Sequence, residues 1–156
     1  MSRILSHSTK GKIRNVIAAL LNSESTLALA TSGEDGAPHI APLFYIAGEK
    51  FELYWFSSPS SRHSLNLKAH PEAAVTVYRA TSEWKEICGV QMRGAVSIVA
   101  GAAQREAVTR AYCERFRLGA TFQNAIASSN LYLFQPKWVR YIDNSLGFGY
   151  KSEIEL

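Results

Sequence analysis

The sequence predicts an α+β protein: a small antiparallel β-barrel of about six strands with helices at its periphery. Two observations support this fold class. Three strand-like runs follow one another between residues 26 and 57 with only turn-length connections. Helical patterns occur near the N-terminus and after residue 101, whereas a parallel sheet would need a helix between most of its strands.

Length and composition are those of one globular domain over residues 1–156. The chain is 47% hydrophobic and 19% charged, as in ordinary soluble proteins. Its net charge of +4 is spread along the chain, which favours an anionic small molecule over a nucleic acid. No apolar run reaches the roughly 18 residues that span a bilayer, and no signal-peptide core is present. We therefore expect a cytoplasmic protein with no membrane partner.

The first half of the chain predicts a helix, three strands and a second helix. Residues 9–23 carry apolar side chains at helical spacing. The strands "STLALATS", "APHIAPLFYIAG" and "KFELYWFSS" follow, and the turn signal "GEDG" separates the first two. A short helix is expected over about 61–70, ended by Pro71.

The second half predicts two long strands around a helical segment. "AAVTVY" is a strand, and "ICGVQMRGAVSIVA" is a longer one whose glycines indicate bulges or bends. Residues 102–127 predict two helices broken near Gly119. "NLYLFQPKWVRYID" predicts the last strand, with Pro136 marking an edge or a bulge, and residues 144–156 form a tail.

Familiar catalytic motifs are absent from the sequence. It contains no GxSxG, GxxxxGK[ST] or HExxH pattern. The four histidines show no ligand spacing with cysteine or carboxylates, so no metal site is expected. Cys88 and Cys113 stand alone and are expected to be reduced thiols.

The stretch "SSPSSRHSLNLKAHP", residues 57–71, is the strongest candidate for a binding site. A phosphate group favours a fixed cation, hydroxyl donors and unpaired backbone N–H groups at a helix N-terminus. Ser61, Arg62, His63 and Ser64 offer all three within one helical turn. The arginine can bind two phosphate oxygens at once, which a lysine cannot.

A simpler interpretation is a solvated loop in which Ser60 or Ser61 only caps the helix. The preceding aromatic residues favour a ligand instead. Trp55 and Phe56 stand directly before the serines, so a flat ring could lie along the strand with hydroxyl groups at its polar edge. That layout suits a ligand with a ring and a phosphate.

The sequence resembles the FMN-binding split-barrel proteins related to pyridoxamine 5′-phosphate oxidase, above all their short, largely uncharacterised members. The resemblance rests on "LALATSGEDGAPHIAPLFYI", "LYWFSSPSSRHSLNLKAHPEAAVTVY", "WKEICGVQMRGAVSIV" and "VRYIDNSLGFGYKSE". The order S-R-[KH]-x-x-N-L-x-x-x-P matches the family's phosphate-binding turn and helix. The resemblance implies a split β-barrel with FMN as cofactor.

Residue by residue, the resemblance implies that Ser61, Arg62 and His63 contact the FMN phosphate, with His63 standing where many members have lysine. The resemblance also implies Ala41, Leu43 and Tyr45 at the pyrimidine edge of the flavin, Phe56, Ser57 and Ser58 along the isoalloxazine and ribityl chain, and Trp84 over the ring. Packing of Trp84 on its own barrel is the alternative. Relatives have a glutamine in contact with the flavin on a later strand. Gln91 lies near that position, although a direct count places Gly89 there.

The sequence also departs from the named oxidase. True pyridoxamine 5′-phosphate oxidases carry an arginine–x–histidine pair near the C-terminus, whereas this chain reads "RYIDNSLGFGY" and has no histidine after residue 70. Ile46 stands about where relatives have a basic residue. We therefore expect an FMN-dependent oxidoreductase acting on another small molecule, with a nicotinamide as candidate electron donor.

Two alternatives and one assembly stay open. The same fold could serve as a non-enzymatic flavin-binding or stress-related module. It could also hold haem or a deazaflavin coenzyme, with His39 or His63 as the candidate axial ligand of a haem. The resemblance further implies a homodimer with flavin at the subunit interface and the C-terminal tail close to the partner's flavin.

Overall fold

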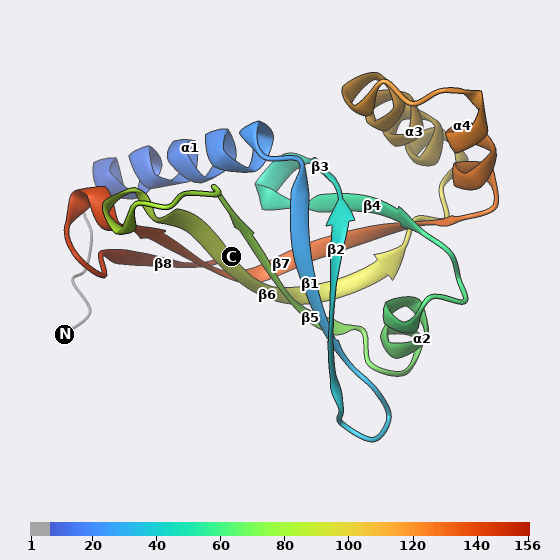
Figure 1. The fold of residues 1–156 in the computed structure, drawn as a ribbon, viewed down its shortest axis with the longest axis horizontal. Helices are drawn as coiled ribbons and strands as arrows, with labels where there is room; N and C mark the ends of the chain where they lie inside the picture. Colours follow the sequence, from blue (N-terminus) through green and yellow to red (C-terminus); the bar gives the residue numbers. More distant parts are fainter. Residues whose placement is uncertain (1–6) are drawn as a thin grey trace.

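A computed structural model describes residues 7–156 as one curled antiparallel sheet with helices around it (Figure 1). The strands of the described chain are β1 (Thr26–Ser32), β2 (Pro38–Phe44), β3 (Ile46–Ala47), β4 (Leu53–Ser57), β5 (Glu72–Tyr78), β6 (Cys88–Ile98), β7 (Asn130–Asp143) and β8 (Lys151–Glu155). The α-helices are α1 (His7–Ser23), α2 (Arg62–Ala69), α3 (Ala102–Phe116) and α4 (Ala120–Ala127). Short 3₁₀ turns lie at Glu49–Phe51, Trp84–Glu86 and Asn144–Leu146.

The sheet curls because one chain segment occupies both of its ends. Its strand order is β2-β1-β5-β6-β7-β4-β3, with β8 added to β7. The two strands at the ends of this path are separated in sequence by Tyr45 alone. Tyr45 is fully buried, its hydroxyl donates to the Leu21 carbonyl at 2.6 Å, and its N–H donates to the Ser25 carbonyl at 3.2 Å. The predicted α+β antiparallel barrel is confirmed.

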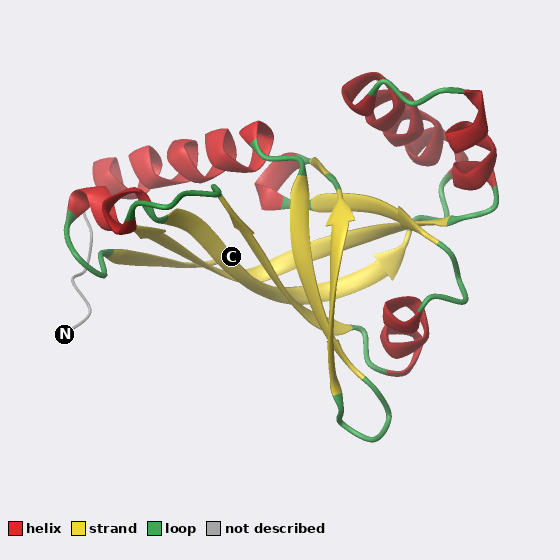
Figure 2. Cartoon of the chain, viewed as in Figure 1, coloured by secondary structure: helices red, strands yellow, loops and turns green. Residues whose placement is uncertain are grey.

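Helix α1 covers one side of this curled sheet (Figure 2). Its inward face carries Ile13, Ile17, Leu20 and Leu21, all in the main hydrophobic core with residues of most strands. The spacing of these residues follows the helical repeat, and this is why the sequence pattern predicts the helix. Among residues 7–156, no helix is long and apolar enough to cross a membrane.

Helices α3 and α4 form a hairpin that stands away from the sheet (Figure 1). Aromatic rings attach it: Phe116 stacks on Phe44 with centroids 4.7 Å apart, and Tyr112 meets Phe56 edge-on at 5.2 Å. The Tyr112 hydroxyl donates to the Phe44 carbonyl at 3.3 Å. The predicted break between two helices is present, with Arg117 in the left-handed region ending α3.

The structure differs from the sequence prediction in its strand count. It adds the two-residue β3, and it adds β8 inside residues 144–156, which were expected to form an irregular tail. Strand β8 alternates strictly, with Ser152 and Ile154 buried between exposed charged residues. This period-2 pattern was a readable strand signal, although a short one.

Pro136 lies in a central strand, opposite a bulge, and not at a sheet edge. The register between β6 and β7 shifts between Arg93 and Gly94, and Gly94 pairs with Pro136. A Cβ at Gly94 would lie 2.7 Å from the Pro136 Cα and closer still to the carbonyl oxygen of Gln135. Only glycine allows the two backbones to approach this closely.

Two prolines lie in the outer strand β2. Pro38 opens this strand opposite Ser32, and Pro42 lies opposite Ala28. In the strand order β2 is the first member, so its other edge pairs with no strand of the described chain.

We predict that Gly94→Ala lowers the free energy of unfolding by about 1–3 kcal/mol, because the methyl group must displace backbone atoms. Gly11→Ala is the matched control. Gly11 lies in α1 with no neighbouring atom within 4 Å of an added Cβ, so this change should stabilise the protein by about 0.5–1 kcal/mol. Urea unfolding of both variants measures the difference, and equal midpoints would contradict the close approach.

Candidate functional site: the N-terminus of helix α2

The N-terminus of α2 leaves two backbone donors unused. Ser61 is the N-cap, and its hydroxyl oxygen accepts from the Ser64 N–H at 3.3 Å. The Ser61 N–H donates to the Ser58 carbonyl at 3.1 Å. The first four N–H groups of a helix have no acceptor within it, so those of Arg62 and His63 are the two that remain. They lie where the helix dipole favours an anion.

A serine–histidine network, defined as Ser57, Ser61, His63 and Ser64, connects this helix end to β4. The His63 ring is only 8% exposed. Its Nε2 lies 2.8 Å from the Ser57 hydroxyl and 3.0 Å from the Ser61 hydroxyl. The Ser61 hydroxyl donates in turn to the Ser64 hydroxyl at 2.8 Å. The network thus joins the end of β4 to the first turn of α2.

Burial makes His63 a neutral residue at physiological pH. Desolvation lowers the pKa of its imidazole, and the neighbouring His39 ring lowers it further. The two rings are stacked, 6.5 Å apart between centroids and 15° from parallel. Neutral His63 therefore contributes hydrogen bonds to this site and leaves the fixed positive charge to Arg62.

Arg62 is exposed, and its guanidinium has no hydrogen bond or ion pair with any residue from 11 to 156. It lines a hollow of about 630 Å³ between α2 and the turn that joins β1 to β2. Lys68 and Asn66 of the same helix and Glu34 and Asp35 of that turn also line it. Arg62 is the first residue of α2 and carries one of the two unused N–H groups, and its unpaired guanidinium can bind two oxygens of one anion.

A buried amide anchors α2 to the sheet. The Asn66 side-chain nitrogen donates to the Thr31 hydroxyl of β1 at 3.0 Å, and both side chains are buried. Leu67 on the same helix enters the main core. These contacts fix the direction in which the first turn of α2 points, and so they fix the site.

The family known as pyridoxamine 5′-phosphate oxidase matches residues 13–143, which include this helix and every strand except β8. The chain belongs to this family. A curated relative, a UPF0306 protein of Yersinia pestis, is 30% identical over 112 residues, which are 71% of this chain and 72% of that protein.

Solved structures share the fold. The Mycobacterium tuberculosis conserved hypothetical protein Rv2991 superimposes with a TM-score of 0.74 at 22% identity, over 97% of this chain and 96% of that one. General stress protein 26 of Bacillus anthracis gives 0.67 at 15% identity, over 92% and 98%. A haem-binding protein of Mycobacterium smegmatis gives 0.70 at 17% identity, over 88% and 56%. These superpositions show that the chain shares its fold with all three proteins.

The aromatic side chains before the serines are engaged inside the chain. Trp55 is 0% exposed and stacks on Tyr132, with ring centroids 5.8 Å apart. Phe56 faces the opposite side of β4, where the Arg105 guanidinium lies 5.4 Å from its ring centre and Tyr112 covers its edge. Trp55 is thus buried inside the chain, and Phe56 is half-buried between Arg105 and Tyr112.

The β2 residues implied by the family resemblance lie in two environments. Ala41 and Leu43 are half-buried, and Leu43 packs against the main core. Tyr45 lies in that core with its hydroxyl and its N–H already bonded, as described above. Ser58, in contrast, is exposed beside α2, and its hydroxyl lies 2.9 Å from that of Ser60.

Gln91 lies far from the α2 site within one chain. Ser57 pairs with Asn130 at one end of β7, and Gln91 pairs through β6 with Arg140, ten residues further along that strand. Ten residues of strand span about 30 Å. Gln91 and the serine–histidine network could contact the same small ligand only if one of them came from a second copy of the chain.

Trp84 lies beyond Gln91 at the same end of the sheet. Its ring is half-exposed, meets Phe148 edge-on at 5.7 Å, and has the Lys85 ammonium 5.5 Å from its centre. Its carbonyl accepts from the Asn144 side chain at 2.8 Å. Gly89, the alternative to Gln91, pairs with Ile142 in the same region.

Sequence reasoning missed two contacts of this site: the stacking of His39 on His63 and the Thr31–Asn66 bond. Asn66 was visible inside the family motif, but its partner lies 35 residues earlier. His39 was named only as a candidate haem ligand, because only the return of β2 beside α2 brings the two imidazoles together.

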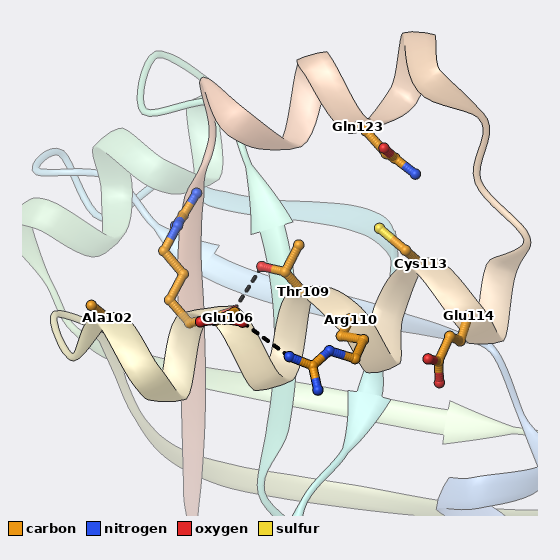
Figure 3. Close-up of a pocket in the computed structure, with 8 residues that line it drawn as sticks. Ala102, Glu106, Thr109, Arg110, Cys113, Glu114 and Gln123 are labelled. Carbon is orange, nitrogen blue, oxygen red and sulfur yellow. Dashed lines mark hydrogen bonds and ion pairs between the residues drawn. The ribbon is translucent and has the colours of Figure 1, made fainter.

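A second hollow, of about 620 Å³, lies between α3 and α4 (Figure 3). Cys113 and Gln123 face each other across it. Its arginines are already engaged: Arg110 pairs with Glu106 at 3.0 Å, and Arg105 donates to two carbonyl oxygens at the end of α4 at 3.2 and 2.8 Å. This groove therefore offers a poorer phosphate site than α2. Among the residues that the structure describes, no three His, Cys, Asp or Glu side chains are grouped to hold a metal ion.

We predict that Asn66→Ala lowers the free energy of unfolding by about 1–3 kcal/mol, because it leaves the Thr31 hydroxyl buried without a partner. Thr31→Val removes that hydroxyl at nearly constant shape. In a double-mutant cycle by urea unfolding, Thr31→Val should cost less in the Asn66→Ala background than alone. Strictly additive costs would show that the two side chains do not stabilise each other.

Proposed function

We propose that this family member binds FMN by its phosphate at the N-terminus of α2 and acts as a flavin-dependent oxidoreductase on a small molecule. The observation that carries the proposal is the first turn of α2, which combines an exposed, unpaired Arg62, two unused helix N–H groups and the serine–histidine network. These groups form a donor set for one phosphate, held rigidly by the Thr31–Asn66 bond.

The number of hydrogen-bond donors in this set and its positive charge both suit a phosphate monoester. Arg62 supplies the positive charge, the N–H groups of Arg62 and His63 supply directed donors, and the exposed Ser58 supplies a hydroxyl at the entrance. Hydrogen bonds with an ionised partner are about twice as strong as neutral ones. A phosphate therefore gains more here than a neutral ligand of the same size would.

Bound FMN would supply hydride or electron transfer, which the side chains of this protein cannot perform. The chain's own residues would bind the phosphate, orient the ring and shield it from water. Because the flavin would carry out the electron transfer itself, the site needs no catalytic acid–base pair. The candidate electron donor remains a nicotinamide.

The substrate is expected to differ from pyridoxamine 5′-phosphate. The region corresponding to the oxidase's arginine–x–histidine pair contains Arg140, whose guanidinium pairs with Glu153 at 2.8 Å. No histidine follows residue 70 in the sequence. The side chains that would recognise that substrate are thus missing or already paired.

A homodimer is part of the proposal. Gln91 lies about 30 Å along the strands from the serine–histidine network of its own chain, and Trp84 precedes the same end of β6. If the residues implied by the resemblance act on one flavin, a second copy must supply them. The proposed assembly therefore places the flavin between two chains, with α2 of one chain and the Gln91 end of the other on either side.

Haem is the second candidate, because one protein of this fold is a haem-binding protein. A haem needs an axial ligand, and the Nε2 of His63 is already bonded to two serine hydroxyls. His39, half-buried beside it, is the more available imidazole. The phosphate donors of α2 have no equivalent role toward a haem iron, so the geometry favours FMN.

The test is the visible spectrum of the purified protein, followed by mass identification of any released cofactor. Flavin absorption with stoichiometric FMN supports the proposal, whereas a Soret band replaces FMN with haem and a deazaflavin mass replaces it with that coenzyme. If the protein is colourless and added FMN does not raise its melting temperature, the proposed site is wrong. Bound FMN that NADH or NADPH does not reduce would favour a non-enzymatic, stress-related module.

We predict that Arg62→Ala weakens FMN binding by about 1.5–3 kcal/mol, or roughly tenfold to 150-fold in Kd, through lost charge-assisted bonds. Arg110→Ala is the matched control: this exposed arginine lies on α3 and pairs with Glu106, so its loss should change Kd much less. Quenching of flavin fluorescence measures both. Riboflavin, which lacks the phosphate, should bind wild type and Arg62→Ala equally, and an equal loss for both ligands would contradict a phosphate contact.

A further inference from the structure

The hydroxyl protons of the serine–histidine network can be assigned from its geometry. Ser61 has one hydroxyl proton, and it is donated to the Ser64 hydroxyl. The Ser61 oxygen must therefore accept at its 3.0 Å contact with the Nε2 of His63. An Nε2 that donates carries a proton and has no lone pair to offer.

The same assignment fixes the role of Ser57. Its hydroxyl lies 2.8 Å from the same Nε2, so it too accepts from the imidazole. Its own proton then has no acceptor among residues 11–156, although the side chain is only 9% exposed. A buried hydroxyl donor without a partner is costly unless a ligand supplies the acceptor.

We propose that His63 is a positioning residue: its Nε2–H holds the Ser57 and Ser61 oxygens as acceptors, so that the Ser57 proton is presented to an anionic oxygen of the ligand. This inference rests on the proposed phosphate site. The family resemblance implied that His63 replaces a lysine and contacts the phosphate directly, whereas here His63 acts through Ser57.

The titrating atom of His63 is then Nδ1. The groups that contact the ring are Ser57 of β4, Ser61 at the N-cap of α2 and His39 of β2. The charged side chains of Glu34, Asp35, Arg62 and Lys68 line the neighbouring hollow beside α2. Without ligand, burial and His39 keep the pKa of His63 low. A bound anion raises that pKa, so part of the affinity is present at low pH and is lost as pH rises through the pKa of the bound state.

The free protein provides the first test. Nitrogen-15 NMR of the His63 imidazole at pH 8 distinguishes the two neutral tautomers. We expect the Nε2–H form, and an Nδ1–H ring would overturn the inference whether or not FMN binds. Ser61→Ala removes the acceptor on which the assignment depends, so the Nδ1–H form should then become populated, with the Ser57 hydroxyl donating to Nε2.

Ligand binding provides the second test, with FMN and riboflavin as probes. Ser57→Ala and His63→Leu should each raise the Kd for FMN about tenfold or more and leave that for riboflavin unchanged. Because both changes remove the same oriented donor, the double variant should lose little more than either one. His63→Gln keeps an amide donor near the Nε2 position and should restore most of the affinity at pH 8. Additive losses, or no rescue by glutamine, would overturn the indirect role.

The pH dependence separates His63 from the ligand's own titration. Calorimetry at pH 6.5 in two buffers of different ionisation enthalpy counts the protons taken up with FMN, whose phosphate also titrates near pH 6. His63→Gln should remove the protein's share of this uptake, and the control His70→Gln, at the far end of α2, should not. If wild type binds neither FMN nor inorganic phosphate, the proposed function itself is overturned, and the tautomer result alone then decides the proton assignment.

Discussion

The Tyr45 side chain lies where β2 turns into β3, and its hydroxyl donates to the Leu21 carbonyl inside the core. This contact joins the end of α1 to the corner at which the sheet curls on itself. Burial raises the pKa of the Tyr45 phenol far above neutrality, so the donor stays protonated at any physiological pH. Because β4 begins just beyond this corner, the position of Ser57 and the serine–histidine network depends on it.

Beyond that corner, short chain segments and one buried hydrogen bond hold the candidate site in place, and ion pairs do not. Strand β4 ends at Ser57, three residues carry the chain to the N-cap Ser61, and α2 is fixed by the Thr31–Asn66 bond. The ion pairs among the described side chains are largely exposed and contribute little to stability. The rigidity of the first turn of α2 thus follows from the core and one buried amide.

The sequence predicted the parts of this site that are encoded locally. Ser61 as N-cap and Pro71 after the helix placed α2 to within a residue or two. The inward turn of His63 was not predictable, because its partner Ser57 lies on a strand whose direction depends on the whole sheet. The surroundings of Trp55 and Phe56 were not predictable for a related reason: Tyr132 covers one face of β4 and Tyr112 the other, and both come from distant parts of the chain. β8 was overlooked although its alternation was readable, since charged residues dominate its five positions.

The prolines of β2 have a consequence for how copies of this protein can associate. An exposed strand edge is a template for pairing with another chain, and it is the usual starting point of ordered aggregation. Pro38 and Pro42 each lack the N–H that such pairing needs, at two positions of a seven-residue strand. A second molecule gains little by extending the sheet from this edge. Copies of the protein should therefore associate through the faces of the curled sheet. There, contacts between side chains decide which partner fits, and hydrogen bonds between paired strands do not.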